Sequence, residues 1–280
     1  MKFPSTKRIA RKILPPLMYD IYSHFRKKSV MEIIKQEYKY YCPVCGNQIM
    51  DFRRLPDFLV EQWDKYGYIH SFLNAETFNY LKYNCPVCSC SDRSRLYALY
   101  FEQRFSDMEL SKLTYNFLDI APERPLADWI KKHPFIQYRS LDLNMEGVDD
   151  NADITDLSIY EENRFDIILC SHVLEHIVDD RKAMAELFRV LKPDGFAIVM
   201  VPIILTLQED LENPEWTSEA DRWKYYGQND HVRMYSKGGF IKKLEQTGFK
   251  VFQHGIDYFG EKVFTKHGIH SRSVLYIVEK

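Results

Sequence analysis

From residue 113 onward, segments typical of strands alternate with segments typical of helices. One of the strand-like segments reads RFDIILCSH, at residues 164–172, in which Ile167, Ile168 and Leu169 follow one another. An extended run of this kind is apolar on both faces, as in a parallel strand covered by helices on each side. The alternation therefore predicts an α/β domain built on a doubly wound, mostly parallel sheet.

The expected sheet has seven strands. We predict them from the apolar runs at residues 114–121, 135–143, 152–157, 164–172, 196–203, 250–259 and 273–280. Helices are predicted at residues 124–133, 179–192 and 237–249. The last two strands have no helical pattern between them, so we expect them to form a hairpin-like pair at one edge of the sheet.

Two copies of the sequence Cys-Pro-Val-Cys precede this domain. They supply four thiols, from Cys42, Cys45, Cys85 and Cys88. Four thiolates in two such knuckles bind one tetrahedral Zn²⁺ and leave no open coordination position, so the ion is predicted to be structural. Cys90 is an alternative ligand, and four ordinary buried cysteines are the alternative interpretation. We therefore expect a zinc-binding subdomain at residues 42–112, before the sheet domain at residues 113–280.

The first 41 residues are basic, with a net charge of about +7, although the whole chain carries −2. Within them, residues 17–40 are predicted to form a helix with Leu17, Ile21 and Phe25 on one face. The helix either packs on the zinc subdomain with its charges in solvent or rests on an anionic membrane surface.

No apolar run approaches the roughly 20 residues needed to cross a bilayer. The N-terminus also lacks the apolar stretch of a secretory signal. We therefore expect a cytoplasmic protein, with a peripheral location at the inner membrane surface as the variant. Cysteines are reduced in that compartment, which favours metal over disulfides for the paired cysteines.

The segment from Phe165 to Pro202 has an almost continuous family resemblance. Its pattern FD…SHVLEH…RVLKP-G resembles the class I S-adenosylmethionine-dependent methyltransferases, particularly the group that includes the ubiquinone-biosynthesis C-methyltransferases. The cysteine pairs, with APE, HVLEH and GQNDHVRMY, also resemble a bacterial subgroup often found among surface-polysaccharide genes. The resemblance implies a Rossmann-like methyltransferase sheet, S-adenosyl-L-methionine as cofactor and methyl transfer as the reaction.

The resemblance also assigns the loop FLDIAPERPL. It places Asp119 at the acid that ends the first strand, and puts Ala121, Glu123 and Pro125 where family members have glycines. Alanine is small enough for close approach to a ligand, and the Glu123 carboxylate is a candidate partner for the cofactor's ammonium group. A plain strand-to-helix turn is the alternative.

Five further positions at strand ends are predicted to bind the cofactor. Asp142 would accept hydrogen bonds from the ribose hydroxyls. The resemblance puts Asp153, followed by Ile154, near the adenine amino group, and Ser171 and His172 should line the cofactor from below. Helix caps or turn residues are the alternative interpretation for the two acids.

The acceptor side is predicted from the segment GQNDHVRMY at residues 227–235. Removing a proton from a hydroxyl needs a base of the histidine type. We expect His231 to be that base with Asp230 supporting it, followed by His176 and then His172 as alternatives. A surface loop histidine without a role is the competing interpretation. Polar and aromatic residues of the same insert are candidates for holding the acceptor: Glu209, Asp210, Trp216, Arg222, Trp223, Tyr225 and Tyr226.

Residues 172–176 also match the His-x-x-Glu-His pattern of inverted zinc peptidases. That chemistry needs the motif inside a helix, and here it directly follows an apolar strand. We reject it.

The sequence is compatible with three functions. The leading hypothesis is an O-methyltransferase acting on a saccharide or another small molecule. The second is an RNA methyltransferase whose zinc subdomain and basic N-terminus hold the nucleic acid, although residues 42–280 are acidic overall. The third is a non-catalytic scaffold with a degenerate cofactor loop.

Overall fold

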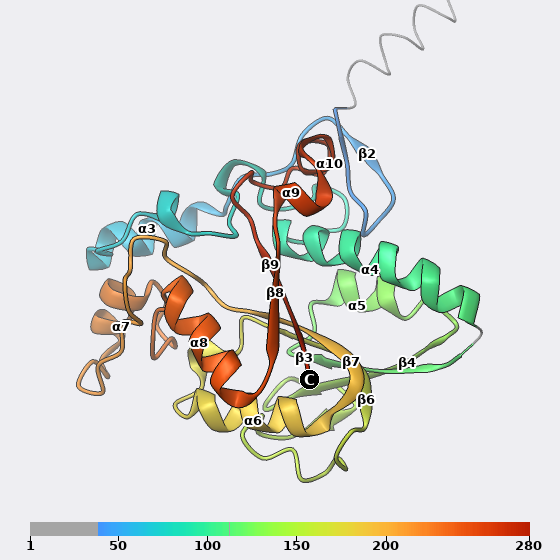
Figure 1. The fold of residues 1–280 in the computed structure, drawn as a ribbon. Coiled ribbons are helices and arrows are strands. Elements are labelled where there is room, and N and C mark those ends of the chain that lie inside the picture. The colour runs from blue at the N-terminus through green and yellow to red at the C-terminus, as the bar shows by residue number, and fades with distance from the viewer. Residues whose placement is uncertain (1–38, 112) are drawn as a thin grey trace, which may run out of the picture.

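The computed structural model describes residues 39–111 and 113–280. Almost all of the predicted helix at residues 17–40 lies outside these ranges. Figure 1 shows a central twisted sheet with helices on both sides and a smaller unit above it that contains the N-terminal part of the described chain.

The sheet has seven strands in the order β5-β4-β3-β6-β7-β9-β8. Their bounds are β3 (Tyr115–Ile120), β4 (Ile136–Asp142), β5 (Asp150–Asn151), β6 (Phe165–Ser171), β7 (Leu191–Met200), β8 (Lys250–His254) and β9 (Leu275–Glu279). Strands β3 to β7 pair in parallel, and β9 runs antiparallel to both β7 and β8. The predicted doubly wound seven-stranded sheet is confirmed. The chain order reverses between β3 and β6, so the carboxyl ends of these two strands flank the crevice in which such sheets bind ligands.

Two details of the predicted sheet are wrong. The third strand is β5 and covers only two residues, while residues 152–157 form turns whose Ile154 and Leu157 are buried. The final two strands do pair, but the short helices α9 (Ile256–Phe259) and α10 (Glu261–Lys266) lie between them. Gly260, with a φ of 91°, allows the chain to turn between these two helices.

Helices cover both faces of the sheet. These helices are α4 (Asp92–Ser111), α5 (Arg124–Ile130), α6 (Asp180–Val190) and α8 (Lys237–Thr247). Helix α7 (Glu219–Tyr226) packs instead against α3 (Asp57–Tyr66). In the view of Figure 1, α4 and α5 lie above the sheet and α6 lies below it. Side-chain oxygens of Asp179, Ser218 and Ser236 cap the first turns of α6, α7 and α8. Three further segments are single 3₁₀ turns: η1 (Phe72–Asn74), η2 (Tyr80–Lys82) and η3 (Leu174–His176).

The smaller unit contains the cysteine knuckles. It has a two-stranded ribbon, β1 (Tyr40–Tyr41) and β2 (Gln48–Ile49), and the helix α3 (Asp57–Tyr66). Helix α4 follows the second knuckle and packs on the main sheet, because the ring of Phe101 contacts Phe117 of β3 and Phe196 of β7. The two units thus share one hydrophobic core, and the predicted division at residue 112 remains a prediction.

Arg95 of α4 connects the two units. Its side chain is fully buried, and its guanidinium donates hydrogen bonds to backbone carbonyls of Lys82, Tyr83 and Cys90 on one side and of His267 and Gly268 on the other. The same group lies 3.8 Å from the centre of the Phe52 ring. A planar guanidinium with five N–H donors suits such a cluster of carbonyls.

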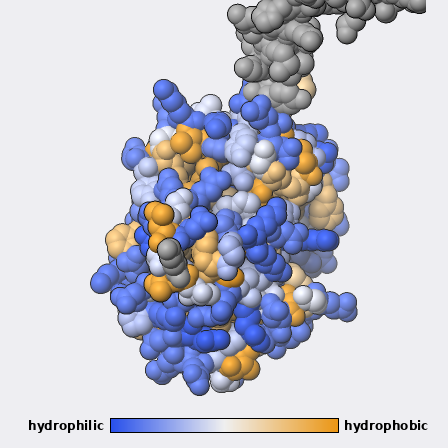
Figure 2. Space-filling model, turned by 90° about the vertical axis from the view of Figure 1, so that its right-hand side faces the viewer, coloured by the Kyte–Doolittle hydropathy of each residue, from blue (hydrophilic) through white to orange (hydrophobic). Residues whose placement is uncertain are grey.

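The surface in Figure 2 is mostly hydrophilic, and hydrophobic residues lie on it in small groups separated by polar ones. Such a distribution is ordinary for a face in contact with water. Within the described ranges, no helix combines the length and the apolar character that crossing a membrane requires.

Candidate active site

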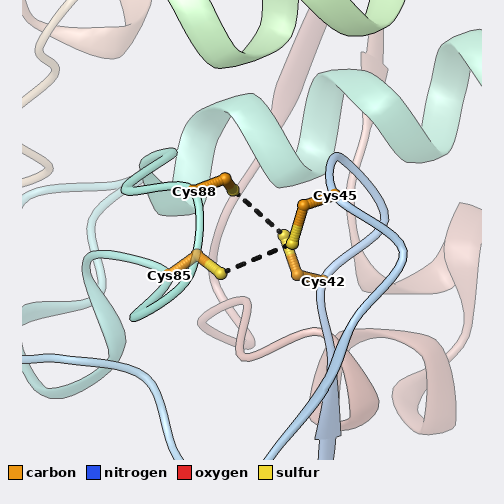
Figure 3. Close-up of side chains that lie close together, drawn as sticks. All are labelled: Cys42, Cys45, Cys85 and Cys88. Carbon is orange, nitrogen blue, oxygen red and sulfur yellow. Dashed lines mark hydrogen bonds between the residues drawn. The ribbon is translucent and has the colours of Figure 1, made fainter.

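The four predicted zinc ligands converge. Their sulfur atoms all lie within 4.8 Å of one another, and Figure 3 shows the two knuckles facing each other. The Cys42–Cys88 and Cys45–Cys85 sulfur pairs are each 3.8 Å apart. A tetrahedral ion with Zn–S bonds of about 2.3 Å separates its sulfurs by about 3.8 Å. The donor type and spacing therefore fit Zn²⁺.

The knuckles share one backbone geometry. Gly46 and Ser89 each follow the second cysteine of a knuckle, have φ values of 71° and 64°, and donate a backbone hydrogen bond to the first cysteine of their knuckle. Cys90 is buried, and its sulfur lies 3.4 Å from that of Cys42. It is nevertheless not one of the four mutually close sulfurs.

The loop after β3 has the backbone of a glycine turn although it lacks glycine. Ala121 has a φ of 54°, in the left-handed region that favours glycine. His172, which follows β6, has a φ of 57°. Each residue donates its backbone N–H to the neighbouring strand, to Leu141 and Met200 respectively, before the chain turns away. The two strained positions therefore flank the switch-point crevice from both sides.

Two acids of this loop are engaged within the protein. Asp119 is buried at 1% exposure and accepts a 2.7 Å hydrogen bond from the Tyr138 hydroxyl. Burial raises the pKa of Asp119 to about 7. The Glu123 carboxylate accepts hydrogen bonds from the backbone and hydroxyl of Ser91 and from the hydroxyl of Ser94. It thus ties the loop to the start of α4, and its contact with a cofactor ammonium group stays a prediction.

The described residues line three cavities around the strand ends. The first, the loop cavity, measures about 270 Å³ and is lined by Arg93, Asp119, Ala121, Glu123 and Ser171 among others. The second, the carboxylate cavity, measures about 380 Å³ and is lined by Asp142, Asp153, Ile154, His176 and Asp230 among others. The third, the aromatic cavity, measures about 110 Å³ and is lined by Trp63, Tyr68, Phe72, Tyr226 and His231 among others. His172 lines all three.

Two acids of the carboxylate cavity, Asp142 and Asp153, are oriented by local hydrogen bonds. Oδ1 of Asp142 accepts from the backbone N–H groups of Asn144 and Met145, at 2.8 and 2.7 Å. Oδ1 of Asp153 accepts from the N–H of Thr155 at 2.8 Å. Within the described ranges, the second oxygen of each carboxylate has no hydrogen-bond partner. These oxygens are therefore available to a ligand.

Histidines gather beside the crevice. His231 is 3% exposed, and its Nδ1 lies 3.2 Å from the Tyr226 carbonyl oxygen. The ring of His176 stands perpendicular to that of His231, with 4.7 Å between ring centres. Asp230 lies 3.3 Å from Nδ1 of His176, so the structure pairs this acid with His176 instead of with the expected His231. Burial lowers the pKa of His231.

His172 contacts two charged groups of opposite sign. Its Nδ1 lies 3.3 Å from Nη1 of Arg93 and 3.1 Å from Oε1 of Glu175. Burial, together with the Arg93 cation, lowers the pKa of His172 to about 4. His172 is therefore neutral at pH 7, and its Nδ1 is the atom that contacts both Arg93 and Glu175.

A family model described as "Methyltransferase domain" matches residues 92–254. The chain belongs to this methyltransferase family. The match includes the loop after β3, Asp142 and Asp153 of the carboxylate cavity, and the whole histidine cluster. It begins at the first residue of α4. A comparison with curated proteins found no match.

Solved structures were also compared with the chain. An S-adenosylmethionine-dependent methyltransferase from Archaeoglobus fulgidus has 15% identity and a TM-score of 0.44, over 67% of this chain and 94% of its own. One from Mesorhizobium loti has 14% identity and a TM-score of 0.40, over 60% and 92%. The [4+2]-cyclase SpnF has 13% identity and a TM-score of 0.44, over 79% and 91%.

The residues of this methyltransferase domain fit S-adenosylmethionine. The loop cavity and the carboxylate cavity share Ala121, the residue with glycine-like backbone, so an elongated ligand can extend from one to the other past it. Ser171, at the end of β6, hydrogen-bonds Tyr97 at 2.8 Å and lines the loop cavity.

Several residues of the candidate acceptor site were not predicted. Trp63, Tyr68 and Phe72 come from the segment between the two cysteine knuckles, and Arg93 comes from the first turn of α4. The three aromatic residues were visible in the sequence, but no local sequence pattern indicates that the segment between the knuckles folds over the strand ends.

Most of the predicted acceptor residues in the insert have other contacts. Asp210 accepts hydrogen bonds from the backbone and hydroxyl of Ser236, before α8. Trp216 and Tyr225 stack on each other with 3.6 Å between ring centres. Of the insert's candidates, Tyr226 and His231 line the aromatic cavity.

Proposed function

We propose that this methyltransferase transfers the methyl group of S-adenosylmethionine to a hydroxyl oxygen of a small molecule, with saccharides as the preferred class. The position of His172 carries the proposal, because this residue lines the two cavities that fit the cofactor and the aromatic cavity beside them. A methyl group bound at this junction can be reached in line by an acceptor in the aromatic cavity.

The donor is oriented by charge. Asp142 and Asp153 would hold the ribose and the adenine through their unused oxygens, as an acid at the end of the second strand does in dinucleotide folds. Arg93 lines the loop cavity together with Ala121, and its guanidinium suits the carboxylate of the cofactor's methionine part.

The aromatic cavity suits a ring-shaped acceptor. Trp63 and Tyr68 stack with 5.6 Å between ring centres, and Trp63 and Phe72 with 5.9 Å. Flat apolar faces of this kind pack against the C–H face of a sugar ring or against an aromatic ring. These three aromatic residues belong to the segment between the two cysteine knuckles. A structural Zn²⁺ in the knuckles would therefore also stabilise the acceptor site.

The acceptor proton is assigned to His231. Its Nδ1 points to the Tyr226 carbonyl, so Nδ1 carries the hydrogen and Nε2 presents a lone pair. The neutral ring takes the hydroxyl proton, the oxygen attacks the sulfonium methyl carbon, and the carbon–sulfur bond breaks. The products are a methyl ether and S-adenosylhomocysteine.

The proposal is tested by a methyl-transfer assay with labelled cofactor and an extract of the native host. We expect label in a low-molecular-weight product that is heavier by one methylene. Label confined to ribonuclease-sensitive material would replace the proposal with RNA methylation, and the absence of cofactor binding would favour a scaffold.

The cofactor site is tested separately by calorimetry with S-adenosylhomocysteine. Asp142→Asn retains an oxygen for the turn but replaces the second acceptor with a donor. We expect it to weaken binding at least tenfold, as about 1.5–3 kcal/mol for a charged hydrogen bond implies. Glu146→Gln, at an exposed residue of the same loop, is the matched control and should bind normally.

A further inference from the structure

Glu175 is a buried carboxylate that lacks a hydrogen-bond donor in the described part of the chain. It is fully buried, and neither of its oxygens has a hydrogen-bond partner among residues 39–111 and 113–280. An ionised carboxylate in such a place is costly unless a cation or hydrogen-bond donors compensate it. The position therefore calls for a positive charge.

We propose that Glu175, His176 and His231 form a divalent-metal site, separate from the four-cysteine cluster, between the carboxylate cavity and the aromatic cavity. The carboxylate and one ring nitrogen of each histidine lie within 4.8 Å of one another. Two ligands of one ion, each at about 2.0–2.2 Å, are separated by roughly 3–4 Å. Small side-chain rotations therefore bring the three groups onto one ion.

In both histidines, Nδ1 has an oxygen partner of the kind that ligating histidines have in metal sites. Nδ1 of His231 faces the Tyr226 carbonyl, and Nδ1 of His176 faces the Asp230 carboxylate. Ligating histidines almost always donate their other N–H to a carboxylate or a backbone carbonyl, which fixes the tautomer. Both rings are thus set to offer Nε2 to an ion.

A charged histidine is the competing way to compensate Glu175. Nδ1 of His172 lies 3.1 Å from Oε1 of Glu175, but the same nitrogen lies 3.3 Å from the Arg93 guanidinium. Arginine can only donate, so when this nitrogen accepts from Arg93 it has no hydrogen for Glu175. The geometry at His172 favours an external cation.

Two imidazoles and one carboxylate favour a first-row transition ion such as Mn²⁺, Co²⁺ or Zn²⁺ over Mg²⁺ or Ca²⁺, and three protein ligands leave positions open. His176 lines the carboxylate cavity and His231 lines the aromatic cavity, so an open position would face the acceptor.

The chemical consequence, unlike the binding itself, rests on the proposed function. An acceptor hydroxyl bound to the ion has a lowered pKa and loses its proton to solvent water. The resulting oxyanion attacks the sulfonium methyl carbon, the carbon–sulfur bond breaks with its electron pair on sulfur, and S-adenosylhomocysteine leaves. His231 would then act as a ligand, and the ion would replace it as the group that activates the hydroxyl.

The test measures ion binding without cofactor or acceptor. The full chain, given one equivalent of Zn²⁺ so that only the thiolate cluster is filled, is titrated with Mn²⁺. The bound Mn²⁺ is counted by electron paramagnetic resonance, because the thiolates retain Zn²⁺ in preference to Mn²⁺. We expect one Mn²⁺ per chain, with affinity reduced at least tenfold in Glu175→Gln and in the exposed second variant Asp230→Asn. The control His254→Gln, at the last residue of the edge strand β8, should bind as the parent does.

The absence of Mn²⁺ from the parent chain, or unchanged binding in both variants, would overturn the metal site. Circular dichroism shows whether Glu175→Gln folds. If it does not fold, the Mn²⁺ affinity of Asp230→Asn decides whether the metal site exists. Because the titration contains no substrate, its outcome does not depend on whether methyl transfer is detected. A failure of ion binding would leave the proposed transfer with His231 as base.

Discussion

The hydroxyl of Tyr138 on β4 donates a hydrogen bond to the carboxyl group of Asp119 on β3, at 2.7 Å, beneath the candidate cofactor loop. This contact joins the two strands whose ends hold Ala121 and Asp142. Since Asp119 is almost completely buried, the hydrogen bond does not offset the cost of its charge, and burial raises its pKa from 3.8 to about 7.

The stability of the protein should therefore carry a pH dependence from Asp119. The native state keeps the proton up to about pH 7, whereas the unfolded chain loses it near pH 3.8. Stability falls as pH rises between these values, because the native state binds more protons. Relative to Asp119→Asn, we expect the parent to lose roughly 2–3 kcal/mol between pH 5 and pH 8. Urea unfolding of both proteins at several pH values measures this difference in the free energy of unfolding. The same pH dependence in both proteins would contradict the prediction.

Ala121 gives a second prediction, because its φ of 54° is unfavourable for any residue with a Cβ. Ala121→Val adds a β-branched side chain and should destabilise the fold by about 1–2 kcal/mol. It should also weaken S-adenosylhomocysteine binding, since Ala121 lines both cofactor cavities. Ala121→Gly relieves the strain and is the matched control. Equal cofactor affinities of the two variants, measured by calorimetry, would contradict close approach of the ligand at this loop.

Arg95 is predicted to stabilise the junction between the two units. Arg95→Met leaves five carbonyls without their donor, and Arg95→Lys keeps the charge but loses the planar fork. We expect both to lower the free energy of unfolding by about 3 kcal/mol or more. Arg54→Met is the control, because the Arg54–Asp57 pair is exposed and should contribute less than about 1 kcal/mol. If the Arg95 variants lose as little free energy of unfolding as the control does, Arg95 does not stabilise the junction.

The four-cysteine cluster is tested by elemental analysis. Cys85→Ser should lower the zinc content by one ion per chain and lower the melting temperature, because the folding energy of such units depends on the ion. Cys90→Ser should retain that ion, since its sulfur is outside the mutually close set. If Cys90→Ser loses the zinc while Cys85→Ser or Cys88→Ser retains it, Cys90 is a ligand in place of the cysteine whose variant retains the ion.

Apolar runs predicted the sheet because a buried strand is recognisable from its own residues. The segment RFDIILCSH became β6, whose Ile167, Ile168 and Cys170 are fully buried. The same reasoning failed at residues 152–157, where Ile154 and Leu157 are buried from turns instead of from a strand. Their apolar character indicated burial and did not determine the backbone conformation.

The candidate cofactor site was predictable for a topological reason. Asp119, Asp142 and Ser171 end parallel strands, and such ends meet at one edge of the sheet. The conformation of Ala121 was not predictable from residue type, because alanine adopts a positive φ only where the surrounding structure requires it.

The sequence by itself determined which reactive side chains occur at which places along the chain. These are four thiols in two knuckles, acids after buried strands, and histidines after β6 and within the insert. The tertiary structure alone decided that residues between the knuckles cover the strand ends. It also decided that Asp230 lies beside His176, and that Glu175 is buried with no hydrogen-bond donor among the residues that the structure describes. The physical reason is that periodicity and turn chemistry act over a few residues, whereas burial and pairing at this site depend on segments more than 50 residues apart, such as Glu175 and His231.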